Sequence, residues 1–348
     1  MRYKLLGRSG LKVSELCLGT MTFGEDYGWG ASKDESRKMF DAYVEAGGNF
    51  IDTADYYTAG TSEKYVGEFI ASERSRFVLA TKYTLNRRAD DPNAGGSHRK
   101  SLVEALEGSL RRLNTGYIDL YWVHTWDTFT PVEEVMRALD DQVRAGKVLY
   151  VGISNWPAWM ISEANTLAAC RGWSPFVALQ TQYSLIERAS ERELLPMAKA
   201  FDIGITAWSP LGGGVLAGKY NLQDSGPKRF GPQHPRSKDF LTERNLAIAQ
   251  SVLAIAGEIG RTPSQVALNW VCRNPRHPVI IPIIGGRREA HIKDNLDCLD
   301  FELPPPMTAR LDEVSDIELG YPHDYLALPF IRGIAHGKTW PLVDNHRK

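Results

Sequence analysis

The stretch Asn49-Phe50-Ile51-Asp52-Thr53-Ala54-Asp55-Tyr56-Tyr57 decides the fold, because a buried strand ends in it and a polar loop begins. Its apolar start predicts a strand that leaves the core at Asp52. Tyr57 follows in the loop, five residues after Asp52. In a parallel α/β protein, side chains at the carboxyl ends of the strands face the ligand site. An acid and a phenol at this place predict proton chemistry, provided that a neighbouring group lowers the pKa of the tyrosine.

Strand and helix patterns alternate along the chain on both sides of this stretch. We expect strands at residues 16–20, 50–52, 77–81, 118–123, 148–153, 176–180, 204–207 and 279–281. Helical periodicity predicts helices at residues 34–46, 61–72, 97–113, 131–145, 157–170, 191–201, 243–259, 263–273 and 288–299. No linker or shift of composition interrupts the series. The alternation therefore predicts an α/β fold with one (β/α)8 TIM barrel rather than two dinucleotide-binding halves.

Short segments extend the predicted barrel at both ends. Residues 3–5 and 12–14 flank a turn and predict an N-terminal β-hairpin. A short helix at 307–314 and a tail punctuated by proline and glycine follow the last barrel helix. We expect a single domain over residues 1–348, with the barrel at about 15–302 and a C-terminal tail, 303–348, that wraps the barrel.

Composition narrows the class of protein. The chain has 348 residues, of which 43% are hydrophobic and 24% charged, with a formal net charge of −1. This balance gives no electrostatic reason to expect a nucleic acid or a membrane as partner. The chain has neither a signal-peptide pattern nor a long apolar run, and its scattered cysteines and histidines lack metal-ligand spacing. We expect a cytoplasmic protein without a metal, and its oligomeric state stays open.

Polar side chains follow the apolar run of nearly every predicted strand. These residues are Asp52, Lys82, His124, Ser154 with Asn155, Gln180, and Trp208 with Ser209. In a barrel the strand ends converge although they are far apart in sequence, so the set predicts one site.

Two of these groups, Asp52 and Lys82, suit acid catalysis together with Tyr57. A free tyrosine has a pKa of about 10, which is too high for efficient proton transfer at neutral pH. A lysine ammonium beside Tyr57 stabilises the phenolate, and a carboxylate paired with that lysine holds the ammonium in place. Lys82 and Asp52 supply these two parts. We expect His124 to orient a substrate oxygen as neutral imidazole.

Five stretches together resemble the aldo-keto reductase superfamily. They are Asn49–Tyr57, 79–82, 119–124, 151–155 and 208–211, and they fall in the family's order. The resemblance extends from about Tyr3 to about Glu302 and is closest to the branch of bacterial proteins and potassium-channel β subunits. It implies a catalytic tetrad, which carries over as Asp52, Tyr57, Lys82 and His124.

The resemblance also implies NADP(H), bound extended across the barrel top without a glycine-rich fingerprint. At the nicotinamide end the expected contacts are Gly19, Thr20, Met21, Asp52, Ser154, Asn155 and Gln180, with Trp208 stacked on the ring. Along the pyrophosphate they are Ser209, Pro210, Leu211, Gly213, Lys219 and Arg229. At the adenosine end they are Gly285, Arg287, His291, Asp294 and Asn295. Adjacent arginines at a helix start suit a 2′-phosphate, and whether Arg287 or Arg288 holds it stays open.

The expected activity is NADPH-dependent reduction of an aldehyde or ketone to the alcohol, with Tyr57 as general acid. One alternative is a redox-sensing regulatory subunit with little turnover, although the channel-subunit branch carries asparagine in place of His124. A second alternative is a Schiff-base aldolase that uses Lys82. We expect no chemical role for Asp55.

The identity of the substrate stays open. Trp29, Trp126 and Phe129 in the predicted loops suggest an aromatic pocket wall for a bulky or apolar carbonyl compound. The sequence does not decide whether the tail closes this pocket or forms a subunit contact.

Overall fold

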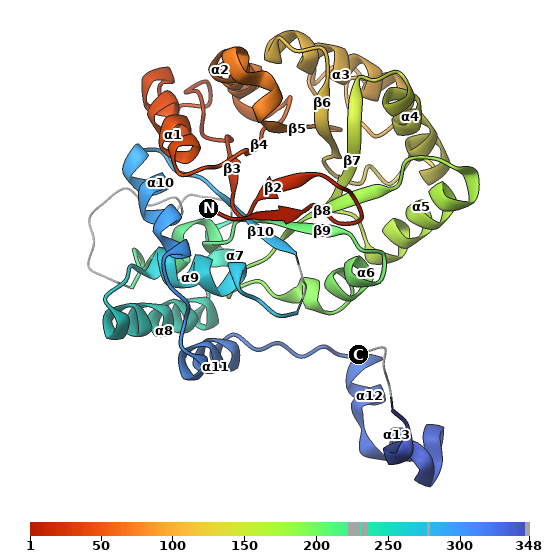
Figure 1. The fold of residues 1–348 in the computed structure, drawn as a ribbon, viewed down its shortest axis with the longest axis vertical. Coiled ribbons are helices and arrows are strands. Elements are labelled where there is room, and N and C mark those ends of the chain that lie inside the picture. Colours follow the sequence, from red (N-terminus) through yellow and green to blue (C-terminus); the bar gives the residue numbers. More distant parts are fainter. Residues whose placement is uncertain (222–229, 231–235, 277–278, 345–348) are drawn as a thin grey trace.

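The computed structural model describes residues 1–221, 230, 236–276 and 279–344. Within this part of the chain, eight parallel strands close into a barrel in chain order (Figure 1). The strands are β3 (Cys17–Gly19), β4 (Phe50–Asp52), β5 (Val78–Tyr83), β6 (Ile118–Val123), β7 (Val148–Ser154), β8 (Phe176–Gln182), β9 (Gly204–Trp208) and β10 (Ile280–Ile284). The last strand closes on the first, with Ile283 paired with Cys17. The predicted TIM barrel is confirmed.

Helices surround the barrel on its outer face (Figure 1). They are α1 (Lys33–Glu45), α2 (Thr61–Ile70), α3 (Arg99–Leu113), α4 (Val132–Arg144), α5 (Ala158–Arg171), α6 (Leu194–Ala200), α8 (Glu243–Ile259), α9 (Pro263–Cys272) and α10 (Glu289–Leu296). A short helix that the sequence did not predict, α7 (Ser237–Phe240), precedes α8. In the described residues we find no helix with the length and apolar character needed to cross a membrane.

Local capping explains where several of these helices begin and end. Helix α8 ends at Gly260, whose φ of 64° is a left-handed conformation that glycine adopts without strain. Helix α9 then begins with a capping box formed by Thr262 and Gln265. Pro263, between them, lies in the first turn of the helix. Helix α6 begins three residues later than predicted, because Pro196 is tolerated only in the first turn of a helix.

An N-terminal hairpin closes one end of the barrel. Its strands β1 (Tyr3–Leu5) and β2 (Lys12–Ser14) pair antiparallel, as predicted. Leu6 and Val13 pack onto the apolar side chains inside the barrel. Gly7 has a φ of 52°, and a Cβ there would lie 2.3 Å from the carbonyl oxygen of Val177. Because Val177 lies near the amino end of β8, the hairpin covers the amino-terminal ends of the strands.

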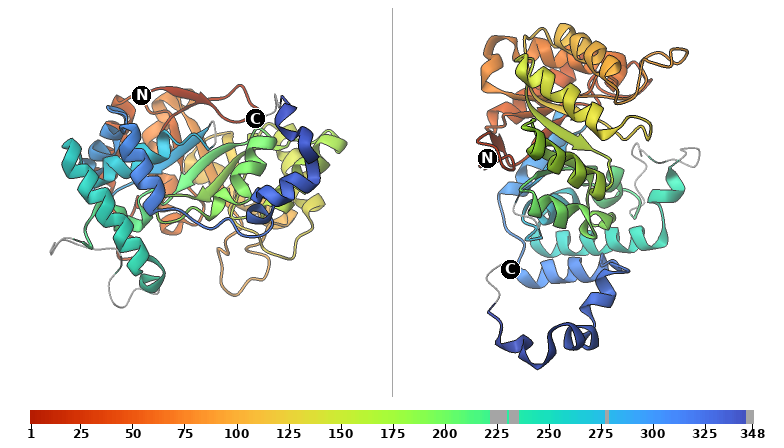
Figure 2. Two further views of the ribbon diagram at one scale, coloured as in Figure 1. Left: turned by 90° about the horizontal axis from the view of Figure 1, so that it is seen from below. Right: turned by 90° about the vertical axis from the view of Figure 1, so that its right-hand side faces the viewer.

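The C-terminal tail leaves the barrel instead of wrapping it. Helix α11 (Pro305–Val314) packs against α8, but α12 (His323–Ala327) and α13 (Pro329–His336) lie beside the barrel, away from the carboxyl ends of the strands (Figure 2). Two apolar side chains of α13, Phe330 and Ile334, are 72% and 67% exposed. The expectation that the tail wraps the barrel is therefore wrong, because its apolar side chains find no barrel surface to cover.

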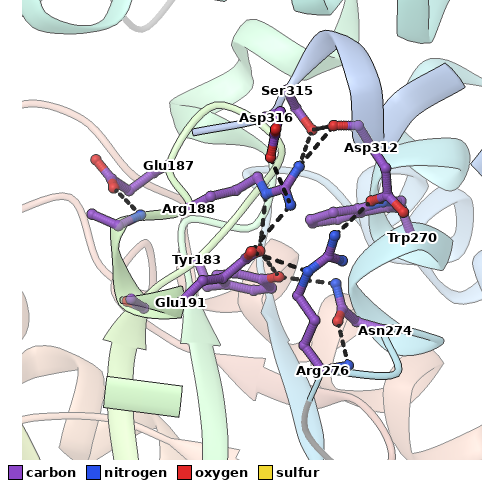
Figure 3. A network of polar contacts seen from close by, with 12 residues as sticks. Tyr183, Glu187, Arg188, Glu191, Trp270, Asn274, Arg276, Asp312, Ser315 and Asp316 are labelled. Carbon is purple, nitrogen blue, oxygen red and sulfur yellow. Dashed lines mark hydrogen bonds and ion pairs between the residues drawn. The ribbon is translucent and has the colours of Figure 1, made fainter. Parts of the chain in front are cut away.

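A buried polar network fastens the segment between β8 and α6 to α9 and α11 (Figure 3). Arg188 is only 2% exposed and donates to both carboxylate oxygens of Glu191, at 2.9 and 3.1 Å. It also donates to the hydroxyl of Ser315 at 2.8 Å and to the carbonyl of Asp312 at 2.9 Å. The Tyr183 hydroxyl donates to Glu191 at 2.7 Å. A guanidinium with this many acceptors stabilises the fold only while all of them are present.

We expect Arg188→Met to lower the free energy of unfolding by about 3 to 5 kcal/mol, because it leaves buried acceptors and a carboxylate without their cation. Chemical denaturation measures the change. The control is Arg37→Met, which removes an exposed pair with Asp41 and should leave stability nearly unchanged. Equal denaturation midpoints for the two variants would contradict the assignment.

Candidate active site

Four polar groups meet at the end of the barrel opposite the hairpin. Asp52 ends β4, Lys82 lies near the end of β5, and His124 directly follows β6. Tyr57 comes from the loop after β4 and turns back toward the strand ends, so that its hydroxyl reaches Lys82. The structure thus brings together the four residues that the sequence singled out.

The Lys82 ammonium is the centre of this group. It is fully buried and donates to the carboxylate of Asp52 through Oδ2. Its other partners are the carbonyl oxygen of Thr53 at 2.9 Å and the Tyr57 hydroxyl at 3.1 Å. An ammonium has three N–H donors, so these acceptors satisfy all of them. The second oxygen of Asp52 accepts from Nε2 of Gln180 at 3.0 Å, which fixes the carboxylate in turn.

The surroundings shift the pKa of both partners. Burial lowers the pKa of Lys82, but Asp52 and Tyr57 counter it, so the net shift is upward and the amine is charged. Desolvation raises the pKa of Tyr57 more than Lys82 lowers it, and the net shift is also upward. The expected lowering of the tyrosine pKa is therefore wrong for the protein by itself. Tyr57 is protonated at neutral pH, as a proton donor must be. The Lys82 ammonium is placed to stabilise the negative charge of the phenolate.

His124 is a neutral imidazole facing the tyrosine. Burial, together with the Lys82 charge, lowers its pKa to about 3. Its ring centroid lies 6.0 Å from that of Tyr57, with the planes at 82°. Nδ1 of the ring is buried and finds no hydrogen-bond partner among the residues that the structure describes, while the His124 carbonyl accepts from the Asn155 amide at 2.9 Å. A neutral ring beside a phenol can bind a carbonyl oxygen without competing for its proton.

The turn that carries Tyr57, residues 57–60, has a strained backbone. Thr58 and Ala59 have φ values of 45° and 53°, a left-handed conformation that costs non-glycine residues about 1–2 kcal/mol each. The Tyr27 hydroxyl donates to the Tyr56 carbonyl at 2.5 Å and accepts from the Ala59 N–H at 3.3 Å. These bonds hold the turn from outside. Such strain is commonly found at functional sites.

The residues expected at the nicotinamide end are mostly tied to one another. The Asn155 amide bonds the His124 carbonyl, and its oxygen accepts from Nε1 of Trp208 at 3.3 Å. Gln180 donates to Asp52. The Ser154 hydroxyl is different, because it is buried and has no hydrogen-bond partner in the described residues. A carboxamide bound here would give that hydroxyl a partner.

Three further residues expected at this end lie on β3 and just after it. Thr20 donates from its hydroxyl to the Asp52 carbonyl at 3.0 Å, so it supports the strand end from behind. Gly19 ends β3, and a Cβ there would lie 2.6 Å from the side chain of Ile283. Met21 follows and is partly exposed.

Cations gather at the other expected end of the cofactor. Burial and then the charges of Lys219, Arg288 and Arg287 act together to lower the pKa of His291. These side chains come from the segment after β9 and from the start of α10. Their common field suits a phosphate. The Arg287 guanidinium also lies 5.8 Å from the ring centroid of Trp29, in the segment between β3 and α1.

Other residues of this end have structural partners. Asp294 accepts from the Thr262 hydroxyl at 2.8 Å, and Asn295 donates to the Gly285 carbonyl at 3.4 Å. The first N–H of α10, at Glu289, donates to the Glu35 carboxylate at 2.7 Å, so the start of this helix already has one acidic partner.

The segment between β9 and Lys219 is the one expected to follow the pyrophosphate. Ser209, with a φ of 52°, leads through Pro210 and Leu211 into a 3-10 segment, Gly212–Ala217. Arg229 lies outside the described residues.

The sequence did not reveal three structural features around these residues. The Thr53 carbonyl is a backbone group, which no side-chain pattern reveals. Tyr27 lies in a loop whose path depends on the whole barrel. Asp55, expected to have no role, is buried and pairs with Arg87. Its position two residues before Tyr57 was the one available signal.

Comparisons with known proteins agree with this geometry. A family model described as the aldo/keto reductase family matches residues 15–316. The norsolorinic acid reductase of Aspergillus flavus is 36% identical over 92% of this chain and 83% of that protein. An aryl-alcohol dehydrogenase of Pestalotiopsis microspora is 35% identical over 95% of this chain and 87% of its own. A putative aryl-alcohol dehydrogenase of Saccharomyces cerevisiae is 33% identical, with 92% and 88% covered.

The buried pair of Asp52 and Lys82 can be tested by stability alone. We expect Asp52→Asn to lower the free energy of unfolding by about 3 to 5 kcal/mol, because it leaves a buried ammonium without its carboxylate. Adding Lys82→Met should recover part of this loss, because the double variant buries no unpaired charge. Urea denaturation at pH 7 measures Asp52→Asn, Lys82→Met and the double variant. Strictly additive losses would show that the two groups do not interact.

Proposed function

The chain belongs to the aldo/keto reductase family, and on this premise we propose that it reduces an aldehyde or ketone to the alcohol with NADPH. The observation that carries the proposal is the Lys82 ammonium, buried and bonded to both Asp52 and the Tyr57 hydroxyl. This arrangement prepares a tyrosine to give up its proton to a developing alkoxide.

In the proposed reaction the substrate oxygen lies between the Tyr57 hydroxyl and His124. NADPH held by the residues named below would supply the hydride for the carbonyl carbon. Tyr57 donates its proton to the oxygen, so the C=O bond becomes an alcohol and the tyrosine becomes a phenolate. Lys82, 3.1 Å away, stabilises that phenolate until solvent returns the proton. Asp52 keeps the ammonium in place, and the neutral His124 orients the carbonyl.

The residues fit NADP(H). The Ser154 hydroxyl, which has no partner among the described residues, supports a carboxamide contact. Trp208, at the end of β9, donates from Nε1 to Asn155, the residue that follows Ser154. The cations around His291 support a 2′-phosphate, which favours NADPH over NADH. Gly213, with a φ of 64°, lets the backbone come close to a pyrophosphate.

For the substrate we propose a bulky aromatic carbonyl compound. Relatives carry names that refer to norsolorinic acid and to aryl alcohols. In this chain Trp29 and Phe129 follow strand ends and are 37% and 90% exposed. Exposed aromatic rings in the loops after these strands favour an aromatic ligand.

The geometry argues against a Schiff-base aldolase. That chemistry needs a neutral lysine amine with a free lone pair. Lys82 is charged, and all three of its N–H groups are bonded. A regulatory subunit with little turnover differs from the proposed enzyme only in rate, so turnover decides between them.

We expect Tyr57→Phe to lower kcat by about 10²- to 10⁴-fold, because it removes the proton donor. NADPH binding, followed by quenching of tryptophan fluorescence, should change little. Tyr56→Phe is the matched control, since it removes an adjacent hydroxyl from a side chain that is 44% exposed. Turnover is measured as carbonyl-dependent loss of reduced-nicotinamide absorbance. Wild-type turnover in Tyr57→Phe would refute the mechanism.

We expect Arg287→Ala or Arg288→Ala to weaken NADPH binding about 10-fold or more while NADH binding is unchanged, because only NADPH carries the 2′-phosphate. Lys293→Ala is the control, since it removes a cation of the same helix that pairs with Glu289. Fluorescence titration with each nucleotide gives the dissociation constants. Unchanged NADPH affinity in both arginine variants would remove the basis for the 2′-phosphate site.

A further inference from the structure

A buried carboxylate, that of Asp55, lies next to the catalytic groups but takes no part in the proposed proton transfer. The side chain of Asp55 is fully buried, and its Oδ2 accepts from the Arg87 guanidinium at 3.3 Å. Its Oδ1 has no hydrogen-bond partner among the described residues, and the same holds for Nη2 of Arg87. A buried ionic pair that leaves polar atoms unsatisfied is a poor source of stability.

The position of Asp55 links it mechanically to Tyr57. Its backbone N–H donates to the carbonyl of Lys82 at 3.2 Å. The Tyr57 N–H donates to the Ala54 carbonyl, also at 3.2 Å. Asp55 thus lies inside the short segment that joins the end of β4 to the proton donor. A shift of its side chain moves that segment and, with it, the hydroxyl that Lys82 holds.

Arg87 belongs to a loop, residues 84–98, that is anchored beside His124. The Thr84 hydroxyl accepts from the His124 N–H at 3.3 Å. At the far end of the loop, the Ser97 N–H donates to the Asp127 carboxylate at 2.5 Å. The loop is therefore held at the strand end that carries His124. Through Arg87 it reaches across to the segment that carries Tyr57.

We infer that Asp55 and Arg87 are positioning residues whose ion pair fixes the spacing between Tyr57 and His124. The inference rests on the proposed function, in which these two groups hold one substrate oxygen. Neither Asp55 nor Arg87 touches that oxygen. A misplacement of about 1 Å at a reacting centre can cost about 100-fold in rate, so a strut of this kind acts on kcat.

The cost of the pair to folding supports a role in the reaction. Burial, with help from Glu63 of α2, raises the pKa of Asp55 from an ordinary 3.8 to about 7, although Arg87 and Arg112 lower it. Since the folded-state pKa lies above the unfolded-state value, stability falls as pH rises from about 4 to about 7. The ionised form that pairs with Arg87 is thus present at a net cost to folding.

Other groups face the pair from neighbouring elements. Burial and then the charge of Asp55 raise the pKa of Tyr121 on β6. The Tyr121 hydroxyl is buried and has no hydrogen-bond partner in the described residues. Glu104 of α3 lies 4.0 Å from the Arg87 guanidinium. These groups shape the field of the pair, but the direct bond is the one between Asp55 and Arg87.

The test compares Asp55→Asn and Arg87→Met with a control in the same loop. Arg88→Met is the control, because Arg88 is 53% exposed and pairs with Asp91 and Glu104. We expect kcat to fall about 10- to 100-fold in the first two variants, with NADPH affinity unchanged, and to stay at the wild-type value in Arg88→Met. Hydrogen exchange of residues 84–98 should speed up in the same two variants only.

Two further readouts separate positioning from a structural role. In the wild type kcat should fall as pH drops through about 7, because protonation of Asp55 removes the ion pair, and Asp55→Asn should lack this limb. At pH 8 Asp55→Asn should unfold at a temperature no lower than the wild type. Arg87→Lys should recover part of kcat, since it restores the charge without the planar guanidinium.

The outcomes can be told apart. Wild-type kcat in Asp55→Asn overturns this inference and leaves the proposed function standing. A loss of kcat matched by a lower unfolding temperature at pH 8 also overturns it, because the residue is then structural. Absence of carbonyl turnover in the wild type overturns the proposed function, and this inference falls with it.

Discussion

A lysine ammonium buried without water must find three acceptors, and this requirement organises the catalytic end of the barrel. Lys82 meets it with Asp52, the Thr53 carbonyl and the Tyr57 hydroxyl. The first two acceptors exist only because β4 ends beside β5 in the barrel register, with Asp52 opposite Ala80. The third exists only because a strained turn brings Tyr57 back over the strand ends. Fold, local strain and protonation state are therefore parts of one constraint.

The sequence predicted the barrel well because its evidence was local and periodic. The strand at 118–123 and the helix at 243–259 have the same bounds in the structure as in the prediction. Asp52, Lys82 and His124 were singled out because polar side chains that end apolar runs must meet in a closed barrel. Tyr57 lies in a loop and was selected by the family resemblance. The prediction for the tail failed because apolar residues alone do not tell which surface, if any, they cover. The predicted direction of the pKa shift of Tyr57 was wrong, because the effect of burial cannot be compared with that of a neighbouring charge until both groups are placed in the structure.

The cofactor end shows a different limit. Residue types that suit a dinucleotide are present, but many are already bonded within the protein: Asn155 to His124, Gln180 to Asp52, and Asp294 to Thr262. These bonds hold the three residues in place within the protein. Among the described residues that were expected to contact the cofactor, only Ser154 keeps a buried side-chain polar atom without a hydrogen-bond partner. The hydrogen bonds distinguish residues that support the site from residues that would contact a ligand. The spacing of residues in the sequence carries no information on this difference.

The N-terminal hairpin, which covers the amino-terminal ends of the barrel strands, has a consequence for folding during synthesis. Leu6 and Val13 cover the interior of a barrel whose closing strand is β10. The Lys4 ammonium donates to the carbonyl of Ile280, 276 positions further along the chain. During synthesis the hairpin segment leaves the ribosome long before β10 and must wait for it. Until then its apolar side chains and the open edges of β3 and β9 stay uncovered, so the nascent chain depends on protection that the finished protein no longer needs.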